Sequence, residues 1–120
     1  MKCKQVLSFG EIIADVNQVG EDLHILLYGG DRPHLGCTVL SIPRPSLGNP
    51  EVCSATSSVI NMTGHKDEII CRYLAEKLCS STGKVTVCSG GFHVDHITKE
   101  QLKEVQHGIE QLSKKIIEFL

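Results

Sequence analysis

His93 and Asp95 lie two residues apart in a chain of 120 residues, and their side chains are the pair best suited to do chemistry. Alternate side chains of an extended backbone share one face, so the imidazole and the carboxylate are expected to stand side by side. Such a pair can move a proton, or bind a metal ion if other ligands join it. The alternative is structural, with the acid fixing the tautomer of the imidazole. No second ligand set lies nearby in the sequence, so we assign no metal-binding residue.

Two other segments combine glycine, histidine and an acid after a strand-like run. Residues 29–36 read Gly-Gly-Asp-Arg-Pro-His-Leu-Gly, and residues 63–68 read Thr-Gly-His-Lys-Asp-Glu. Alone, the first is typical of a turn, because Gly, Pro and Asp are common turn residues. The second is typical of a helix start, where anions bind readily, although the spacing is not that of a Walker A loop.

The occurrence of all three segments in one chain predicts a shared site, since functional residues gather at the ends of strands and helices. We expect a phosphate group to be held by His65, Lys66 and the helix start, and a polar pocket to be shaped by the other groups. No G-x-S-x-G nucleophile motif is present and nothing indicates that Cys88 is activated, so the catalytic residues stay unassigned and a non-enzymatic role is favoured. The predicted ligand-binding residues are Gly30, Asp31, His34, Gly64, His65, Lys66, Gly91, His93 and Asp95.

Composition limits the classes of protein that remain. Hydrophobic residues make up 41% and charged residues 22%, which is typical of one globular domain spanning residues 1–120. A net charge of −2 and 4% aromatic residues argue against nucleic-acid binding. No apolar run is long enough for a membrane helix and no signal-peptide core is evident, so we expect a cytoplasmic protein. The six cysteines form no C-x-x-C pair, which favours reduced thiols over a disulfide framework.

Hydrophobic periodicity predicts strands at residues 6–16 (broken at Gly10), 23–28, 35–42, 57–62 and 84–88, and helices at 66–81 and 98–119. Residues 43–50 contain three of the four prolines and are expected to form an exposed loop. This order predicts an α+β fold, in which a largely antiparallel sheet carries both helices on one face. A right-handed parallel crossover across residues 57–88 would make the sheet mixed.

The last helix begins with a capping-box pattern, Thr98 followed by Gln101. Its apolar residues step by three and four, which indicates a narrow stripe that packs lengthwise against another surface. That surface is either the sheet or a second subunit. The second case makes the chain a structural dimerisation module. The residues of the stripe are Leu102, Val105, Ile109, Leu112 and Ile116.

Segments 29–36, 64–68 and 90–100 together resemble the prenylated-flavin chaperone-like family, whose members are accessory subunits of non-oxidative aromatic-acid decarboxylases. The family is similar in fold to the proteasome assembly chaperones. The resemblance runs from about Ile12 to the end, whereas the many cysteines and the 43–50 loop are not features of the family. The residues that match its motifs are Gly30, Asp31, Pro33, His34, Gly64, His65, Lys66, Gly91, His93, Asp95 and Thr98.

This resemblance implies a chaperone-like accessory protein, often a homodimer, that binds prenylated FMN, FMN or the decarboxylase that carries the flavin. Two alternatives of other classes stay open on the residues alone. One is a small metal-dependent enzyme that uses the His/Asp cluster, and the other is the dimerisation module of the last helix.

Overall fold

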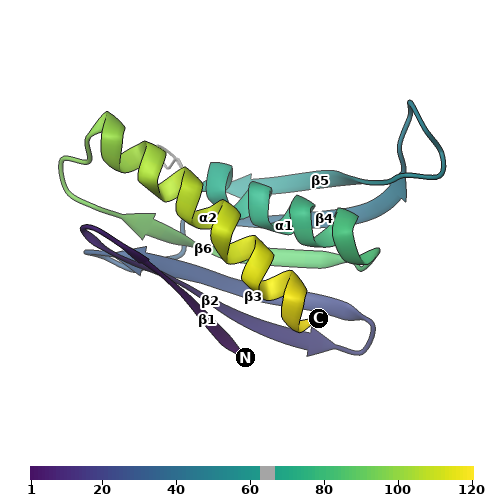
Figure 1. The fold of residues 1–120 in the computed structure, drawn as a ribbon, viewed down its shortest axis with the longest axis horizontal. Coiled ribbons are helices and arrows are strands. Elements are labelled where there is room, and N and C mark those ends of the chain that lie inside the picture. The colour runs from purple at the N-terminus through teal and green to yellow at the C-terminus, as the bar shows by residue number, and fades with distance from the viewer. Residues whose placement is uncertain (63–66) are drawn as a thin grey trace.

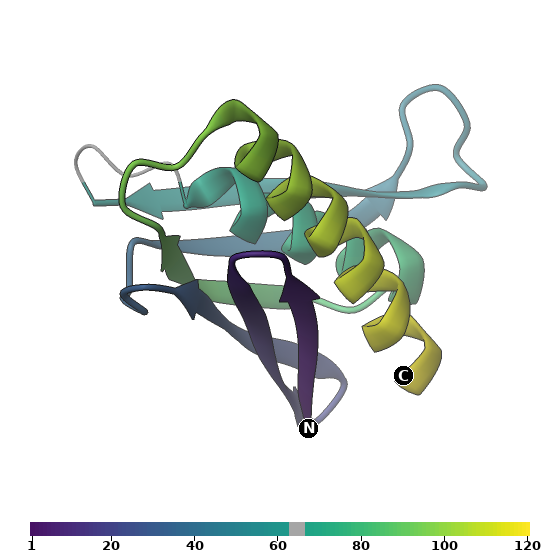
Figure 2. The same cartoon turned by 60° about the vertical axis from the view of Figure 1, so that its left-hand side comes forward.

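A single six-stranded sheet carries two helices on one face (Figure 1). The computed structural model describes residues 1–62 and 67–120. The strands lie in the order β1-β2-β3-β6-β4-β5, and Figure 2 shows both helices on the same side of them. The α+β architecture expected from the sequence is therefore confirmed, while the likeness to proteasome assembly chaperones stays a prediction. The elements are β1 Lys2–Leu7, β2 Gly10–Val19, β3 Asp22–Gly30, β4 Cys37–Pro45, β5 Cys53–Asn61, α1 Glu68–Thr82, β6 Thr86–His93 and α2 Lys99–Phe119.

The sheet is mixed, as the sequence analysis allowed. Strands β5 and β6 are both antiparallel to β4, so they run parallel to each other with β4 between them. Strand β6 pairs directly with β3, in parallel, and with β4. The connection through α1 passes over β4 before the chain returns to the sheet. The crossover therefore inserts β6 in the middle of the sheet, where both of its edges are hydrogen-bonded.

The core lies between the helices and one face of the sheet. Alternate residues of β3, namely Leu23, Ile25 and Leu27, are buried under the helices. The predicted stripe of α2 packs onto the same layer from Val105 onward, and its Leu112 and Ile116 are fully buried within this one chain, whereas Leu102 in the first turn is exposed. The seam is therefore part of the monomer core, and the proposal that it forms a subunit interface was wrong. Thr98 caps α2 in a full capping box, as predicted.

Strand β4 extends through two of the prolines that were expected to lie in a loop. Beyond Ser41 this strand has no contact with β6 and pairs with β5 alone. Ser46 donates its N–H to the Val52 carbonyl at 2.8 Å, so the even-numbered residues of β4 bond to β5. Pro43 and Pro45 therefore lack an N–H only on the side where no strand lies, which is where proline is tolerated.

The far face of the sheet, which we call the uncovered face, carries no helix among the described residues (Figures 1 and 2). Leu40 and Ile42 of β4 are exposed there. None of the described helices is long and apolar enough to cross a membrane.

Candidate functional site

Two of the three motifs leave the sheet at the same place, because β3 and β6 are parallel neighbours. Gly30 at the end of β3 lies beside His93 at the end of β6. Asp31 donates its backbone N–H to the His93 carbonyl at 2.7 Å, and its carboxylate accepts the N–H of Asp95 at 3.2 Å. Asp31 and Asp95, which are 64 positions apart in the sequence, are thus joined directly.

A His–Asp pair with a buried carboxylate and a partly buried imidazole forms the inner part of this region. His34 Nε2 lies 2.9 Å from Asp67 Oδ2, and the Asp67 side chain is only 5% exposed. The other oxygen of Asp67 accepts the backbone N–H of Phe92 at 2.8 Å, so this carboxylate joins the start of α1 to β6. These bonds fix Asp67 between the sheet and the helix.

His34 is placed to carry a positive charge. Its Nδ1 lies 3.0 Å from the Arg32 carbonyl, which can only accept, so Nδ1 carries a hydrogen. The hydrogen bond to the Arg32 carbonyl, followed by the bond to the Asp67 carboxylate, raises the pKa of His34 above its ordinary value, and partial burial opposes this. An imidazolium at this position donates from both nitrogens.

A second His–Asp pair lies further out. His93 Nε2 is 2.9 Å from Asp95 Oδ1, with side chains 44% and 54% exposed. The Arg32 guanidinium donates to the same Asp95 oxygen and also lies 3.4 Å from His93 Nε2. Hydrogen bonds from His93 and then from Arg32 hold the pKa of Asp95 below its ordinary value.

The glycines of the motifs leave room for these side chains. A Cβ on Gly91 would lie 2.7 Å from His34 Nε2, and a Cβ on Gly36 would collide with the Asp67 carboxylate. Gly30 has a φ of 79° and packs against the His93 carbonyl, so a side chain there would be both strained and blocked. The glycine pattern is therefore a packing requirement of the site.

A hollow of about 430 Å³ opens beside these groups. It is lined by Arg32, His34, His93 and two largely exposed apolar side chains, Leu35 and Met62. The two imidazole rings stand edge to face, with centroids 6.4 Å apart. The lining thus joins cationic and hydrogen-bonding groups to an apolar wall. We call this hollow the histidine hollow.

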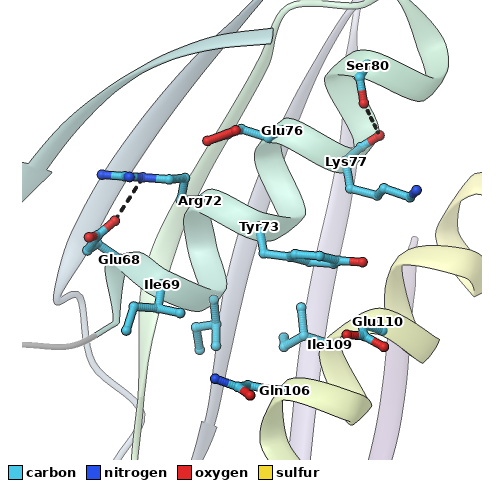
Figure 3. Close-up of a pocket in the computed structure, with 11 residues that line it drawn as sticks. Glu68, Ile69, Arg72, Tyr73, Glu76, Lys77, Ser80, Gln106, Ile109 and Glu110 are labelled. Carbon is cyan, nitrogen blue, oxygen red and sulfur yellow. Dashed lines mark hydrogen bonds and ion pairs between the residues drawn. The ribbon is translucent and has the colours of Figure 1, made fainter. Parts of the chain in front are cut away.

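A larger hollow, of about 560 Å³, lies between α1 and α2 on the helical side (Figure 3). Tyr73 reaches across it toward α2, and Glu68 and Arg72 at one end form an ion pair of 3.0 Å. None of the predicted ligand-binding residues lines it. Size alone therefore does not mark the candidate site.

The structure brings most of the predicted site residues together. Gly30, Asp31, His34, Gly91, His93 and Asp95 all lie around the histidine hollow or support its walls. Gly64, His65 and Lys66 lie outside the described residues. That this cluster binds a ligand stays a prediction. Within residues 1–62 and 67–120, no three His, Cys, Asp or Glu side chains are arranged to hold a metal ion.

Sequence reasoning missed two groups, Arg32 and Asp67. Both lie in the quoted segments 29–36 and 63–68, but neither was among the predicted ligand-binding residues. The signal that could have found Asp67 is Gly36, whose missing side chain makes space for that carboxylate.

Comparison with known proteins places this geometry in a family. Residues 9–120 match the model of the prenylated flavin chaperone LpdD-like domain. The chain is also 27% identical over 111 residues to Protein LpdD of Lactiplantibacillus plantarum, an alignment that covers 85% of this chain and 71% of the relative. The family match extends over almost the whole chain, including both motifs that meet at the histidine hollow. The chain therefore belongs to the prenylated flavin chaperone LpdD-like family.

Proposed function

We propose that this protein is a non-enzymatic accessory protein of prenylated-flavin-dependent decarboxylation, and that its histidine hollow binds a phosphorylated flavin such as prenylated FMN or FMN. The observation that carries the proposal is the convergence of two family motifs on one hollow with a polar and an apolar wall. A flavin mononucleotide likewise has an apolar part and a polar part, namely a flat ring system and an anionic phosphate.

The lining fits each part of such a ligand. Leu35 and Met62, 64% and 57% exposed, offer apolar surface that the ring system would cover. Arg32 and His34 supply the positive charge that a phosphate or the polar edge of the ring requires. A volume of about 430 Å³ is within the range of small-molecule sites.

The charge balance of the hollow favours reversible binding. Arg32 is already paired with Asp95, so an anionic ligand has to compete with that carboxylate for the guanidinium. A chaperone that delivers a cofactor must release it, and this competition weakens the bound state. The decarboxylase is the expected recipient, and the free thiols of all six cysteines suit the reducing cytoplasm in which we place the protein.

Calorimetric titration with FMN and prenylated FMN tests the proposal. We expect replacement of Arg32 by Met, or of His93 by Gln, to weaken binding about tenfold, because each removes one charged or hydrogen-bonding group. His107→Gln is the matched control, since His107 is an exposed histidine of α2 away from the hollow.

Two results would overturn the proposal. One is the absence of heat at high micromolar ligand, with no decarboxylase captured in pull-downs. The other is an equal loss of affinity in the His107→Gln control. The metal-dependent alternative stays a prediction, for which elemental analysis of untagged protein is the measurement.

A further inference from the structure

Strand β5, Cys53–Asn61, is an outer edge of the sheet, and no strand lies beyond it among the described residues (Figures 1 and 2). Its register with β4 shows which backbone groups are free. Met62 donates its N–H to the Gly36 carbonyl at 2.9 Å, and Ser46 donates to the Val52 carbonyl at 2.8 Å. Backbone direction alternates along a strand, so even-numbered residues of β5 bond to β4 and odd-numbered residues face outward.

The outward edge is thus a regular row of donors and acceptors with which no strand of the described residues pairs. It consists of the N–H and C=O groups of Cys53, Ala55, Ser57, Val59 and Asn61. Such a row is a template for another strand, and proteins commonly block it with charges, prolines or bulges. Strand β5 reads Cys-Ser-Ala-Thr-Ser-Ser-Val-Ile-Asn and contains neither a charge nor a proline.

The opposite edge of the same sheet is protected. Strand β1 carries Lys2 and Lys4, and Lys4 forms an ion pair of 3.4 Å with Glu11. Lys115 of α2 donates to the Lys4 carbonyl at 3.2 Å and to Gln5 Oε1 at 2.8 Å. Among the described residues, one edge of this sheet is therefore protected against further pairing and the other is open.

We propose that β5 pairs in antiparallel fashion with β5 of a second copy of this chain, so that two sheets join into one across a two-fold axis. The register with the greatest overlap places Ser57 opposite its own symmetry copy and Ala55 opposite the copy of Val59. All outward groups of the strand then find partners. This inference goes beyond the ligand-binding proposal and does not depend on it.

A second copy suits this edge better than a foreign strand does. A two-fold pairing uses one patch twice, so it requires self-complementarity, and a neutral strand meets its own copy without charge repulsion. Thr56 and Ser58 are exposed on the uncovered face, where each would meet the copy of the other. The edge offers no charge by which a different partner would be selected.

The helices leave room for this arrangement. Helix α1 packs against β4, β5 and β6, so it is centred near β4. Three strand spacings separate β4 from its copy, which is roughly 14 Å. Packed helices need only about 8–10 Å between axes, so the two copies of α1 do not collide.

Light scattering on size-separated protein tests the proposal. We expect the wild-type chain to have twice the mass of one chain, and the double variant T56K/S58K to have the mass of one, because four lysines then meet at the axis. The variant T56E/S58E should also be monomeric alone. An equimolar mixture of the two should recover the dimer, since opposite charges then face each other.

Two further variants separate the edge from other surfaces. Ala55→Pro removes an outward N–H without removing a bond to β4, so it should give folded monomers. His24→Lys places a charge on the uncovered face of β3, three strands away from β5, and should leave the dimer intact. A monomeric wild type, or a dimer that His24→Lys breaks and T56K/S58K does not, would overturn the proposal. Flavin titration of T56K/S58K keeps the two proposals apart, because neither Thr56 nor Ser58 lines the histidine hollow.

Discussion

The two His–Asp pairs of the histidine hollow have the same separation and opposite environments. Both have a nitrogen-to-oxygen distance of 2.9 Å. Asp67 of the inner pair is 5% exposed, whereas Asp95 of the outer pair is 54% exposed. The inner carboxylate also accepts a bond from the backbone of β6, while the outer one is shared with Arg32.

This difference indicates different tasks for chemically similar pairs. A buried charge without a partner is costly, so the inner pair holds the sheet and α1 in register. An exposed pair contributes little to stability because water screens it, which leaves its groups available to a ligand. The inner pair is therefore expected to fix the wall of the hollow, and the outer pair to regulate what binds there.

The largest effect is expected from removing the inner carboxylate. Asp67→Ala leaves the Phe92 N–H and the imidazolium of His34 without their partner, which should cost roughly 3 kcal/mol of unfolding free energy. Urea denaturation measures it. Asp67→Asn is the matched control and should cost less, because an amide can accept from Phe92 and donate to a neutral His34. Equal losses in the two variants would contradict this account.

The inner pair also predicts a dependence of stability on pH. The pKa of His34 is raised on folding, mainly by its bond to the Arg32 carbonyl and then by Asp67. Its stabilising contribution is therefore complete below about pH 6.5, the unfolded value, and is lost as the pH rises through the raised pKa. Unfolding free energies from pH 6 upward should fall for the wild type and fall less for Asp67→Asn. Parallel curves for the two proteins would count against the inner pair as the cause.

The elements of the fold followed from the sequence because their signals are local. The period of Leu23, Ile25 and Leu27 predicts a half-buried strand, and Thr98 with Gln101 marks a helix start. The position of β6 within the sheet could not be predicted from such local signals. Its insertion between β3 and β4 depends on how distant strands pair, and the run of residues 84–88 carries no signal for that.

The histidine hollow was partly predictable for the same reason. Glycine beside histidine and an acid at two strand ends suggested convergence, and the parallel pairing of β3 with β6 produces it. The role of Asp67 depends on a contact across 33 residues, which no local pattern records. Residues 43–45 were wrongly predicted to lie in a loop. Proline excludes a strand only where a neighbouring strand needs its N–H, and the sequence does not show that no strand lies on that side of Pro43 and Pro45.

The smallest effect on stability is expected from a substitution in the outer pair, and this substitution should strengthen ligand binding rather than weaken it. Asp95→Asn should leave the melting temperature within about 2 °C of the wild type, because the pair is exposed. It removes the carboxylate that competes for Arg32, so affinity for FMN should rise about two- to five-fold. Asp95 thus differs from Asp67, whose loss weakens both the fold and the wall of the hollow. Weaker binding by Asp95→Asn in a calorimetric titration would mean that the outer carboxylate holds Arg32 and His93 in place for the ligand, and that both pairs serve the same purpose.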